Sequence, residues 1–266
     1  MRRGLAVLLA LLAVPLAAET VDHVESTLSA PEGRDHSRPA WPVRARLTEP
    51  TDSYDHDVLG GLPPWTVLEV EALACGTCRH GSETVQIFLP DELVFEDVAP
   101  RLWDVTGDGR PEIVVVESHV DKGARLAVWT YSDQGADLTR LATTDFIGTK
   151  HRWLAPAGAA DFDGDGRIEI AYVDRPHILG DLVFVRLEGD RLVETARLPG
   201  LTNHRIGDDH ISGGLRDCGR GPELGPELGP ELVLAALDWT RMLRVRGGVV
   251  ENLGPMPPEG LTVPPC

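Results

Sequence analysis

The sequence lacks the features that mark several large classes of protein. It has 25 Lys and Arg against 42 Asp and Glu, a formal net charge of −17, and so offers no basic face to nucleic acid or to an anionic membrane. No segment longer than a turn or two has helical periodicity. The nucleophile motif G-x-S-x-G, the phosphate-binding P-loop and the zinc motif H-E-x-x-H are missing. These absences argue against nucleic-acid binding and against several common catalytic signatures.

Long apolar runs are also rare, and the longest lies at the N-terminus. Arg2 and Arg3 precede an apolar run over residues 5–16, and two small residues follow at 17 and 18. This is the pattern of a secretory signal peptide, and the run is too short to span a bilayer comfortably. We therefore expect residues 1–18 to be removed on export to the periplasm or the cell exterior, with no membrane insertion afterwards. Losing two arginines changes the formal charge from −17 to −17 − 2 = −19.

Cysteine is scarce, with 4 in the chain. An even number in an exported protein favours disulfides, so we expect Cys75 to pair with Cys78 and Cys218 to pair with Cys266. The Cys75-x-x-Cys78 motif is also compatible with a redox-active dithiol or with half of a zinc site. A redox motif normally opens a helix in a βαβ unit, whereas these residues lie among predicted strands. A structural disulfide is the preferred interpretation.

An internal repeat is the most informative feature of the sequence. Residues 104–112 read DVTGDGRPE and residues 161–169 read DFDGDGRIE, at an offset of 161 − 104 = 57 residues. A shorter, degenerate copy begins at Asp217 and ends at Glu223, offset by 217 − 161 = 56 residues. After it, the tetrapeptide Gly-Pro-Glu-Leu is written three times over residues 221–232, which we interpret as an extended loop that leads into a strand.

Apolar, β-branched segments follow each copy and predict the fold. The expected strands cover 66–72, 84–89, 93–98, 112–117, 125–131, 138–143, 169–173, 182–187, 192–198, 231–237, 242–245 and 249–253. Repeated units of this size cannot bury their faces alone and must stack. We expect an all-β fold, a small β-propeller of about four blades over residues 51–266. The N-terminal segment 19–50 could add a closing strand, near residues 43–47, to the last blade.

The acidic loops have the composition of a calcium site. Calcium prefers six to eight oxygen ligands in a flexible shell, and Asp161, Asp163, Asp165 and Glu169 supply carboxylates, with a carbonyl from Arg167. The equivalent residues of the other loop are Asp104, Thr106, Asp108, Arg110 and Glu112. Thr106 replaces a carboxylate, so we expect that loop to bind calcium more weakly. An acidic surface turn without metal is the alternative.

These two loops, each followed by an apolar strand, resemble the FG-GAP or VCBS-type repeats of β-propellers, including those of integrin α-subunits. The resemblance covers roughly residues 55–254 and extends to exported VCBS-repeat proteins of bacteria. It implies a propeller with calcium in its inter-strand loops. It does not define an activity, and the chain has fewer units than a seven-bladed ring needs.

Two kinds of function remain open. The first is a non-enzymatic binding or interaction module whose partner is an unknown protein or glycan. The second is a hydrolase that uses His204, Asp208, Asp209 and His210 as a general-base cluster. His151 and His204 are repeat-equivalent, which favours a structural role for these histidines and makes the binding module the preferred hypothesis.

Overall fold

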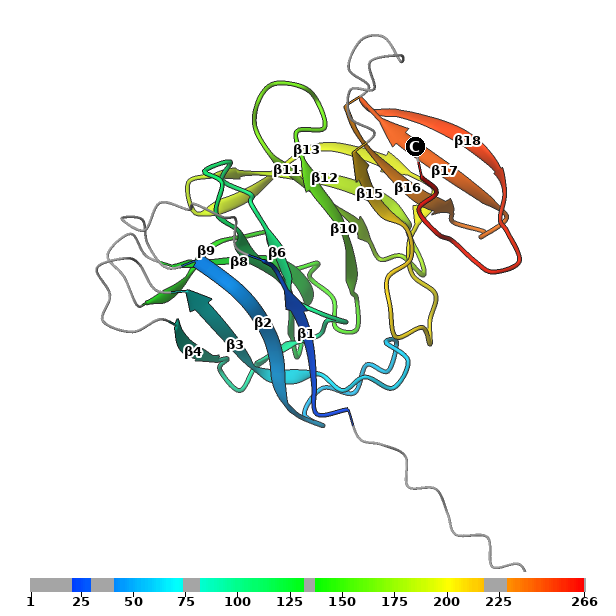
Figure 1. Ribbon diagram of the computed structural model, residues 1–266. Helices are drawn as coiled ribbons and strands as arrows, with labels where there is room; N and C mark the ends of the chain where they lie inside the picture. The colour runs from blue at the N-terminus through cyan, green and yellow to red at the C-terminus, as the bar shows by residue number, and fades with distance from the viewer. Residues whose placement is uncertain (1–20, 30–40, 74–81, 132–136, 218–228, 266) are drawn as a thin grey trace, which may run out of the picture.

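The computed structural model describes residues 21–29, 41–73, 82–131, 137–217 and 229–265. These residues form 18 strands and no helix (Figure 1), which confirms the all-β prediction. Among them, accordingly, there is no helix with the length and apolarity that a bilayer span requires.

The strands group into four antiparallel units around β2, β7, β11 and β16; the first three contain four strands each and the fourth contains five. The first unit contains β1 (His23–Thr27), β2 (Trp41–Pro50), β3 (Trp65–Leu73) and β4 (Ser82–Phe88). The second contains β6 (Arg101–Trp103), β7 (Glu112–His119), β8 (Gly123–Tyr131) and β9 (Leu138–Thr143).

The third and fourth units repeat this plan. The third contains β10 (Leu154–Ala160), β11 (Glu169–Asp174), β12 (Asp181–Glu188) and β13 (Arg191–Pro199). The fourth contains β16 (Pro230–Ala236), β17 (Arg241–Arg246) and β18 (Val249–Pro255), with β14 (Leu201–Thr202) and β15 (Gly214–Asp217) both paired to β16.

Strand pairing also links the first three units to one another. The short β5 (Leu93–Phe95) pairs with β3 on one side and with β7 on the other, and a single parallel pair between Thr143 and Arg191 joins β9 to β13. The result is one hydrogen-bonded sheet of 13 strands, whereas the fourth unit is a separate sheet of 5.

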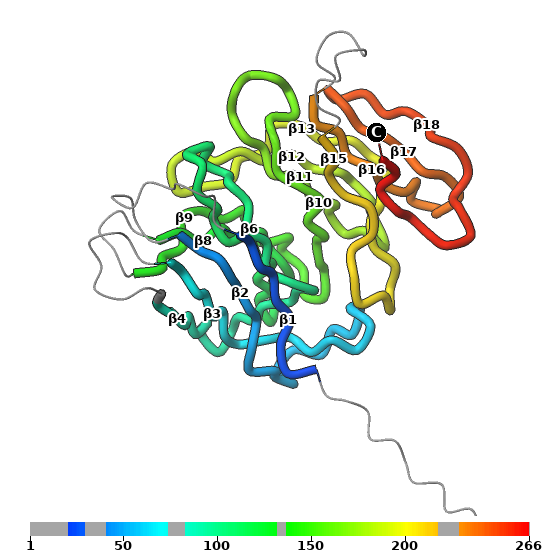
Figure 2. The backbone as a smooth tube through the Cα atoms, in the orientation of Figure 1, coloured from blue at the N-terminus to red at the C-terminus, as the bar shows by residue number. Residues whose placement is uncertain are grey.

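The units lie side by side around a common centre, and β1, β6, β10 and β15 are the strands nearest to it (Figures 1 and 2). Loops close the seam between the first and fourth units. The amide of Gly207 donates to the carbonyl of Val58 at 3.0 Å, so the loop after β2 lies against the segment before β15.

The inner strands define two ends of the molecule. β10 runs from Leu154 to Ala160, so Trp153 lies at one end and Asp161 at the other, separated by about 26 Å at roughly 3.3 Å per residue. The loops 104–111 and 161–168 leave the inner strands at the same end. The segments 51–64, 144–153 and 203–213 lie at the opposite end.

Most of the hydrophobic core lies between units, and a smaller cluster around Val233, Ala235 and Leu261 lies within the fourth unit and the C-terminal segment. In β7, Ile113 and Val115 pack toward the first unit with Trp65, whereas Val114 and Val116 pack toward the third. A third cluster joins β11 and β12 to the fourth unit. Because each side chain of this size contributes about 1.5–3 kcal/mol when it is buried, no unit keeps its stability without its neighbours.

One expectation about the N-terminal segment was wrong. We expected a strand near residues 43–47 to complete the last blade. The strand forms as β2, but it pairs with β1 and β3 of the first unit. The long alternating match between β2 and β3, from Trp41–Leu73 to Pro50–Trp65, outweighs any pairing with the fourth unit.

Candidate metal centre

The two acidic loops occupy equivalent places in the strand ladders. Trp103 pairs with Glu112 at the end of β6 and the start of β7. Ala160 pairs with Glu169 at the same position between β10 and β11. Each loop therefore begins one residue after an inner strand and returns at a glutamate, and both glutamates are 1% exposed.

Loop 161–169 is shaped by hydrogen bonds from its own backbone to its carboxylates. Asp161 accepts the amide of Gly164 on Oδ1 at 2.8 Å and that of Gly166 on Oδ2 at 3.0 Å. Both glycines have positive φ, 80° and 86°, which side chains rarely adopt. Asp163 accepts the amide of Asp165 at 3.0 Å. The Asp-Gly pattern thus folds the turn locally and turns these carboxylates inward.

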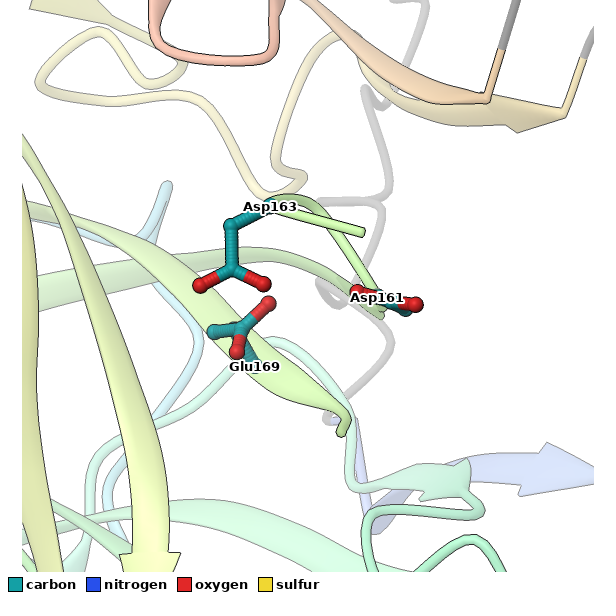
Figure 3. Close-up of side chains that lie close together, drawn as sticks. All are labelled: Asp161, Asp163 and Glu169. Atoms are coloured by element: carbon teal, nitrogen blue, oxygen red, sulfur yellow. The ribbon is translucent and has the colours of Figure 1, made fainter. Parts of the chain in front are cut away.

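Three carboxylates converge in this loop. One oxygen each from Asp161, Asp163 and Glu169 lies within 4.8 Å of the others, and Figure 3 shows Asp163 directed at Glu169 with Asp161 beside them. Glu169 accepts the amide of Phe162 on Oε2 at 2.9 Å, but its Oε1 is buried without a hydrogen-bond partner. Burial raises the pKa of Glu169, and the charges of the nearby aspartates raise it further.

Asp165 and Arg167 lie at the edge of the cluster. Oδ2 of Asp165 accepts Arg186 Nη1 at 2.8 Å, and its Oδ1 accepts the amide of Arg167 at 2.9 Å. The side chain of Arg167 donates to the carbonyl of Leu187 at 3.1 Å. The structure therefore brings together three of the four predicted carboxylates. The carbonyl of Arg167 stays a prediction.

Loop 104–112 has the same turn, but both oxygens of its buried glutamate contact hydrogen-bond donors of the protein. Asp104 accepts the amides of Gly107 at 2.7 Å and Gly109 at 2.8 Å. Glu112 accepts the amide of Val105 at 2.9 Å on Oε2, and its Oε1 lies 3.4 Å from the donating hydroxyl of Thr106.

The other residues of this loop pair with each other. Arg110 Nε donates to Asp108 at 3.1 Å. Burial, together with the charges of Asp108 and Asp104, raises the pKa of Glu112 to about 7. The hydroxyl of Thr106 contacts Oε1 of Glu112, whereas the equivalent Oε1 of Glu169 has no hydrogen-bond partner. This difference agrees with weaker metal binding at loop 104–112.

The fourth unit has a glutamate at the equivalent position of its strand ladder. The sequence suggested that Glu223 closes the degenerate loop, but that residue lies outside the described residues. The ladder places Glu231 opposite Arg216, the position of Glu112 and Glu169. The third copy of the Gly-Pro-Glu-Leu repeat, the one that precedes the strand, supplies this residue.

Glu231 is fully buried and is held by arginines. Arg216 and Arg246 hydrogen-bond to its two oxygens, and Arg244 Nε lies 3.7 Å away. Burial alone would raise the pKa of Glu231, but the hydrogen bonds from Arg246 and Arg216 outweigh it and lower the pKa. Guanidinium groups thus supply the positive charge that this position needs.

The residues of the alternative hydrolase do not converge. His204 is buried, shares a 2.8 Å contact with His177, and lies 3.0 Å from the backbone oxygen of Asp208 rather than its carboxylate. Asp209 and His210 pair with each other at 3.0 Å on the surface. The arrangement gives no support to a general-base cluster.

The other predicted sites have mixed outcomes. His151 pairs with Asp55 at 2.9 Å, a structural contact of the kind expected. The four cysteines, and with them both predicted disulfides, lie outside the described residues, as does the proposed signal peptide.

Comparison with known proteins adds one finding. A search of curated proteins gives no significant match to the chain. Residues 104–172, which contain both acidic loops and the second and third units up to β11, match the sequence profile of the FG-GAP-like repeat.

Proposed function

We propose that this protein is an exported, calcium-binding β-propeller of about four blades that acts as a binding or interaction module. Calcium is held at loop 161–169 and, more weakly, at loop 104–112. The observation that carries the proposal is Oε1 of Glu169, a buried carboxylate oxygen without a hydrogen-bond partner that lies among the carboxylates of Asp161 and Asp163. The nearest cation is Nη1 of Arg186, which lies 4.0 Å from Oε1 and is engaged by Asp165 at 2.8 Å. A buried carboxylate oxygen without a hydrogen bond is costly, and a cation in the loop removes that cost.

The donor set favours calcium over other metals. All side-chain donors are oxygens, whereas zinc sites normally include sulfur or nitrogen. Magnesium requires a small, near-ideal octahedron and retains its waters, whereas calcium accepts a larger and more flexible oxygen shell. Asp161, Asp163 and Glu169 would hold the ion, with the carbonyl of Arg167 as a further ligand. The ion would neutralise the loop and fix its shape.

The four-unit architecture supports the propeller. The first three units are four-stranded antiparallel meanders and the fourth is a five-stranded antiparallel sheet, three of the core clusters join neighbouring units, and one strand of each unit lies near the centre (Figure 1). Radial stacking of this kind protects strand edges and creates end faces made of loops. Such faces suit binding, and the partner class remains a protein or a glycan.

Export rests on the N-terminal sequence and on the cysteines. Mass spectrometry of the secreted protein without reductant should show the mature N-terminus near residue 19 and linkages 75–78 and 218–266. The second link closes a loop of about 48 residues and contributes roughly 3–4 kcal/mol in the chain-entropy model. An intact N-terminus with four free thiols would contradict export and pairing together.

Calcium binding is tested by thermal unfolding with EDTA, calcium or magnesium. A ligand specific for the folded state stabilises it by about 2.7 kcal/mol at a hundredfold excess over Kd, so calcium should raise the Tm and magnesium should raise it much less. Asp163→Ala should remove most of the shift. Asp91→Ala, an exposed turn position in the first unit, should leave it intact.

Substitutions of Thr106 test the second, weaker site. Thr106→Asp should tighten loop 104–112 because it restores the missing carboxylate, and isothermal titration should then show the weaker site more clearly. A Tm that is indifferent to EDTA and to millimolar calcium, with no heat of binding, would reduce both loops to simple turns and refute the metal assignment.

A further inference from the structure

A second candidate site lies at the end of the molecule opposite the acidic loops. A pocket of about 230 Å³ opens there. Its lining comes from three separate segments: the loop after β2, residues 151–153 before β10, and the loop between β11 and β12, with Ile206 from the segment before β15. The first, third and fourth units therefore meet at this pocket, as expected of a site at the centre of an end face.

The pocket contains an arginine that the protein does not neutralise. Nη1 of Arg152 donates to the carbonyl of His151 at 2.8 Å, and no carboxylate of the described residues lies within ion-pair distance of it. Its neighbour Arg175 differs, because two hydrogen bonds of 2.9 and 2.8 Å tie it to Asp174. In a chain of net charge −17, an arginine in a pocket without an acid is a position for an anionic ligand.

The carboxylates near the pocket are already engaged. Glu96 is buried and is bound by His56 at 2.5 Å and by the hydroxyl of Ser118. Asp55 accepts His151 at 2.9 Å and lies 3.3 Å from Lys150. Neither acid is therefore available to compensate Arg152.

The histidines of the lining are fixed in position. His56 and His151 stack with ring centres 5.1 Å apart and planes within 11°. His177 lies parallel to the indole of Trp153 at 6.3 Å and contacts His204 through Nε2. Each of the three imidazoles in the lining therefore has one nitrogen held by the protein.

The remaining walls are apolar. Trp153 and Val58 are buried beneath the pocket, whereas Ile178 and Ile206 are 63% and 65% exposed. Two isoleucines this exposed beside one opening are unusual for a soluble surface and mark a place where an apolar group can bind. The pocket thus combines one cationic position with an apolar wall.

We propose that this pocket binds a small organic carboxylate with an apolar body. The carboxylate pairs with Arg152 and the imidazoles, and the body packs against Trp153, Ile178 and Ile206. The volume holds roughly eight water-sized groups at about 30 Å³ each, which fits one aromatic or short aliphatic acid. The inference goes beyond the protein or glycan partner proposed above, because it adds a small-molecule site to the binding module, and the pocket does not depend on calcium.

The test uses the full mature protein and titration calorimetry with 3-phenylpropionate, with 3-phenylpropanamide as the uncharged analogue. The acid should bind at least tenfold more tightly than the amide. Arg152→Gln should reduce the affinity for the acid at least tenfold and leave that for the amide little changed. Arg205→Gln is the matched control, because Arg205 stacks over Trp239 at 4.2 Å near the same end but does not line the pocket; it should bind the acid like the wild type.

Circular dichroism and the Tm identify the variants that fold. Arg152→Lys keeps the positive charge but loses the planar guanidinium, so its affinity for the acid should lie between those of the wild type and Arg152→Gln. Ile206→Ser should weaken binding of both compounds. Equal binding of acid and amide, unchanged binding in Arg152→Gln, or equal losses in Arg152→Gln and Arg205→Gln would overturn the proposal. Absent acid binding with an intact calcium-dependent Tm shift refutes the pocket alone, whereas acid binding that depends on Arg152 without any calcium effect refutes the metal alone.

Discussion

Glu169 and Glu231 occupy the same position in neighbouring units. Replacing each with glutamine tests whether its buried carboxylate is stabilised by a bound cation or by arginines of the protein. Glu231 is surrounded by Arg216, Arg244 and Arg246. Glu169 has one backbone hydrogen bond, and its other oxygen lies among aspartates with no hydrogen bond and only a distant arginine, Arg186 Nη1 at 4.0 Å. We expect Glu231→Gln to destabilise the protein with or without calcium, and Glu169→Gln to do so only when calcium is present.

The magnitudes follow from the surroundings of each carboxylate. Removing one partner of a buried ion pair costs about 3–5 kcal/mol. The three arginines are 14–26% exposed on their side chains and can regain some water, so we expect about 2–4 kcal/mol for Glu231→Gln. At 2–4 °C per kcal/mol for a chain of this length, its Tm should fall by roughly 4–16 °C. Calcium should not restore it.

Glu169→Gln should behave differently in the two conditions. In EDTA the change should stay within about 1 kcal/mol of zero, because the amide oxygen can still accept the hydrogen bond from Phe162 and one of the repelling charges is removed. At a calcium concentration of a hundred times the wild-type Kd, the variant should lose most of the roughly 2.7 kcal/mol that binding supplies.

Urea and thermal unfolding of the wild type and both variants, each in EDTA and in calcium, measure these differences. A Glu169→Gln variant that is as unstable in EDTA as Glu231→Gln would show that Glu169 is held by the protein itself. A Glu231→Gln variant rescued by calcium would show that the fourth unit also binds the ion. Either result refutes the reasoning from the hydrogen-bond partners.

Two further predictions concern stability. Burial and the nearby His204 lower the pKa of His177 to about 4, so the neutral form contributes stability that is complete above the unfolded pKa of about 6.5 and is lost as the pH falls from there toward 4. Discounted for partial exposure, the loss of stability amounts to about 1–2 kcal/mol. Between pH 7 and 4.5 in EDTA, the Tm of the wild type should therefore fall more than the Tm of His177→Gln. Plots of Tm against pH that run parallel for the two proteins would contradict this prediction. Gly123→Ala should lower the free energy of unfolding by about 2 kcal/mol or more beyond the effect of Gly189→Ala. Both glycines have positive φ, but only at Gly123 would an added Cβ meet a neighbouring atom, the carbonyl oxygen of Thr149 at 2.3 Å. Equal urea midpoints for the two variants would show that this contact is not tight.

The outer strands were predictable from sequence, and the inner ones were not. Alternating β-branched residues placed β7, β8, β11 and β12 within a few residues of their observed bounds. β10 reads LAPAGAA, a composition that favours no strand. The structure supplies the reason: a Cβ on Gly158 would lie 2.8 Å from the Cβ of Leu215. β10 approaches β15 so closely here that small residues replace those that carry strand propensity.

The same distinction applies to the sites. Local spacing was enough to find Asp161, Asp163 and Glu169, because a nine-residue turn brings them together without help from the rest of the chain. It could not show that Asp165 pairs with Arg186 or that Glu231 takes the place expected for Glu223. Both depend on register between strands. The pocket around Arg152 depends on loops from distant units, and no local pattern marks it.

The separation of the fourth unit from the 13-stranded sheet affects how the protein responds to force and how it can evolve. Pulling on the first three units loads strand pairs in which backbone hydrogen bonds share the tension. Pulling on the fourth loads an interface of side chains around Leu201 and Leu232, together with two backbone contacts, from Leu201 to the carbonyl of Gly180 and from Gly207 to the carbonyl of Val58. This seam is the mechanically weak line of the molecule. It is also the place where a further unit can be inserted without breaking an existing strand pair.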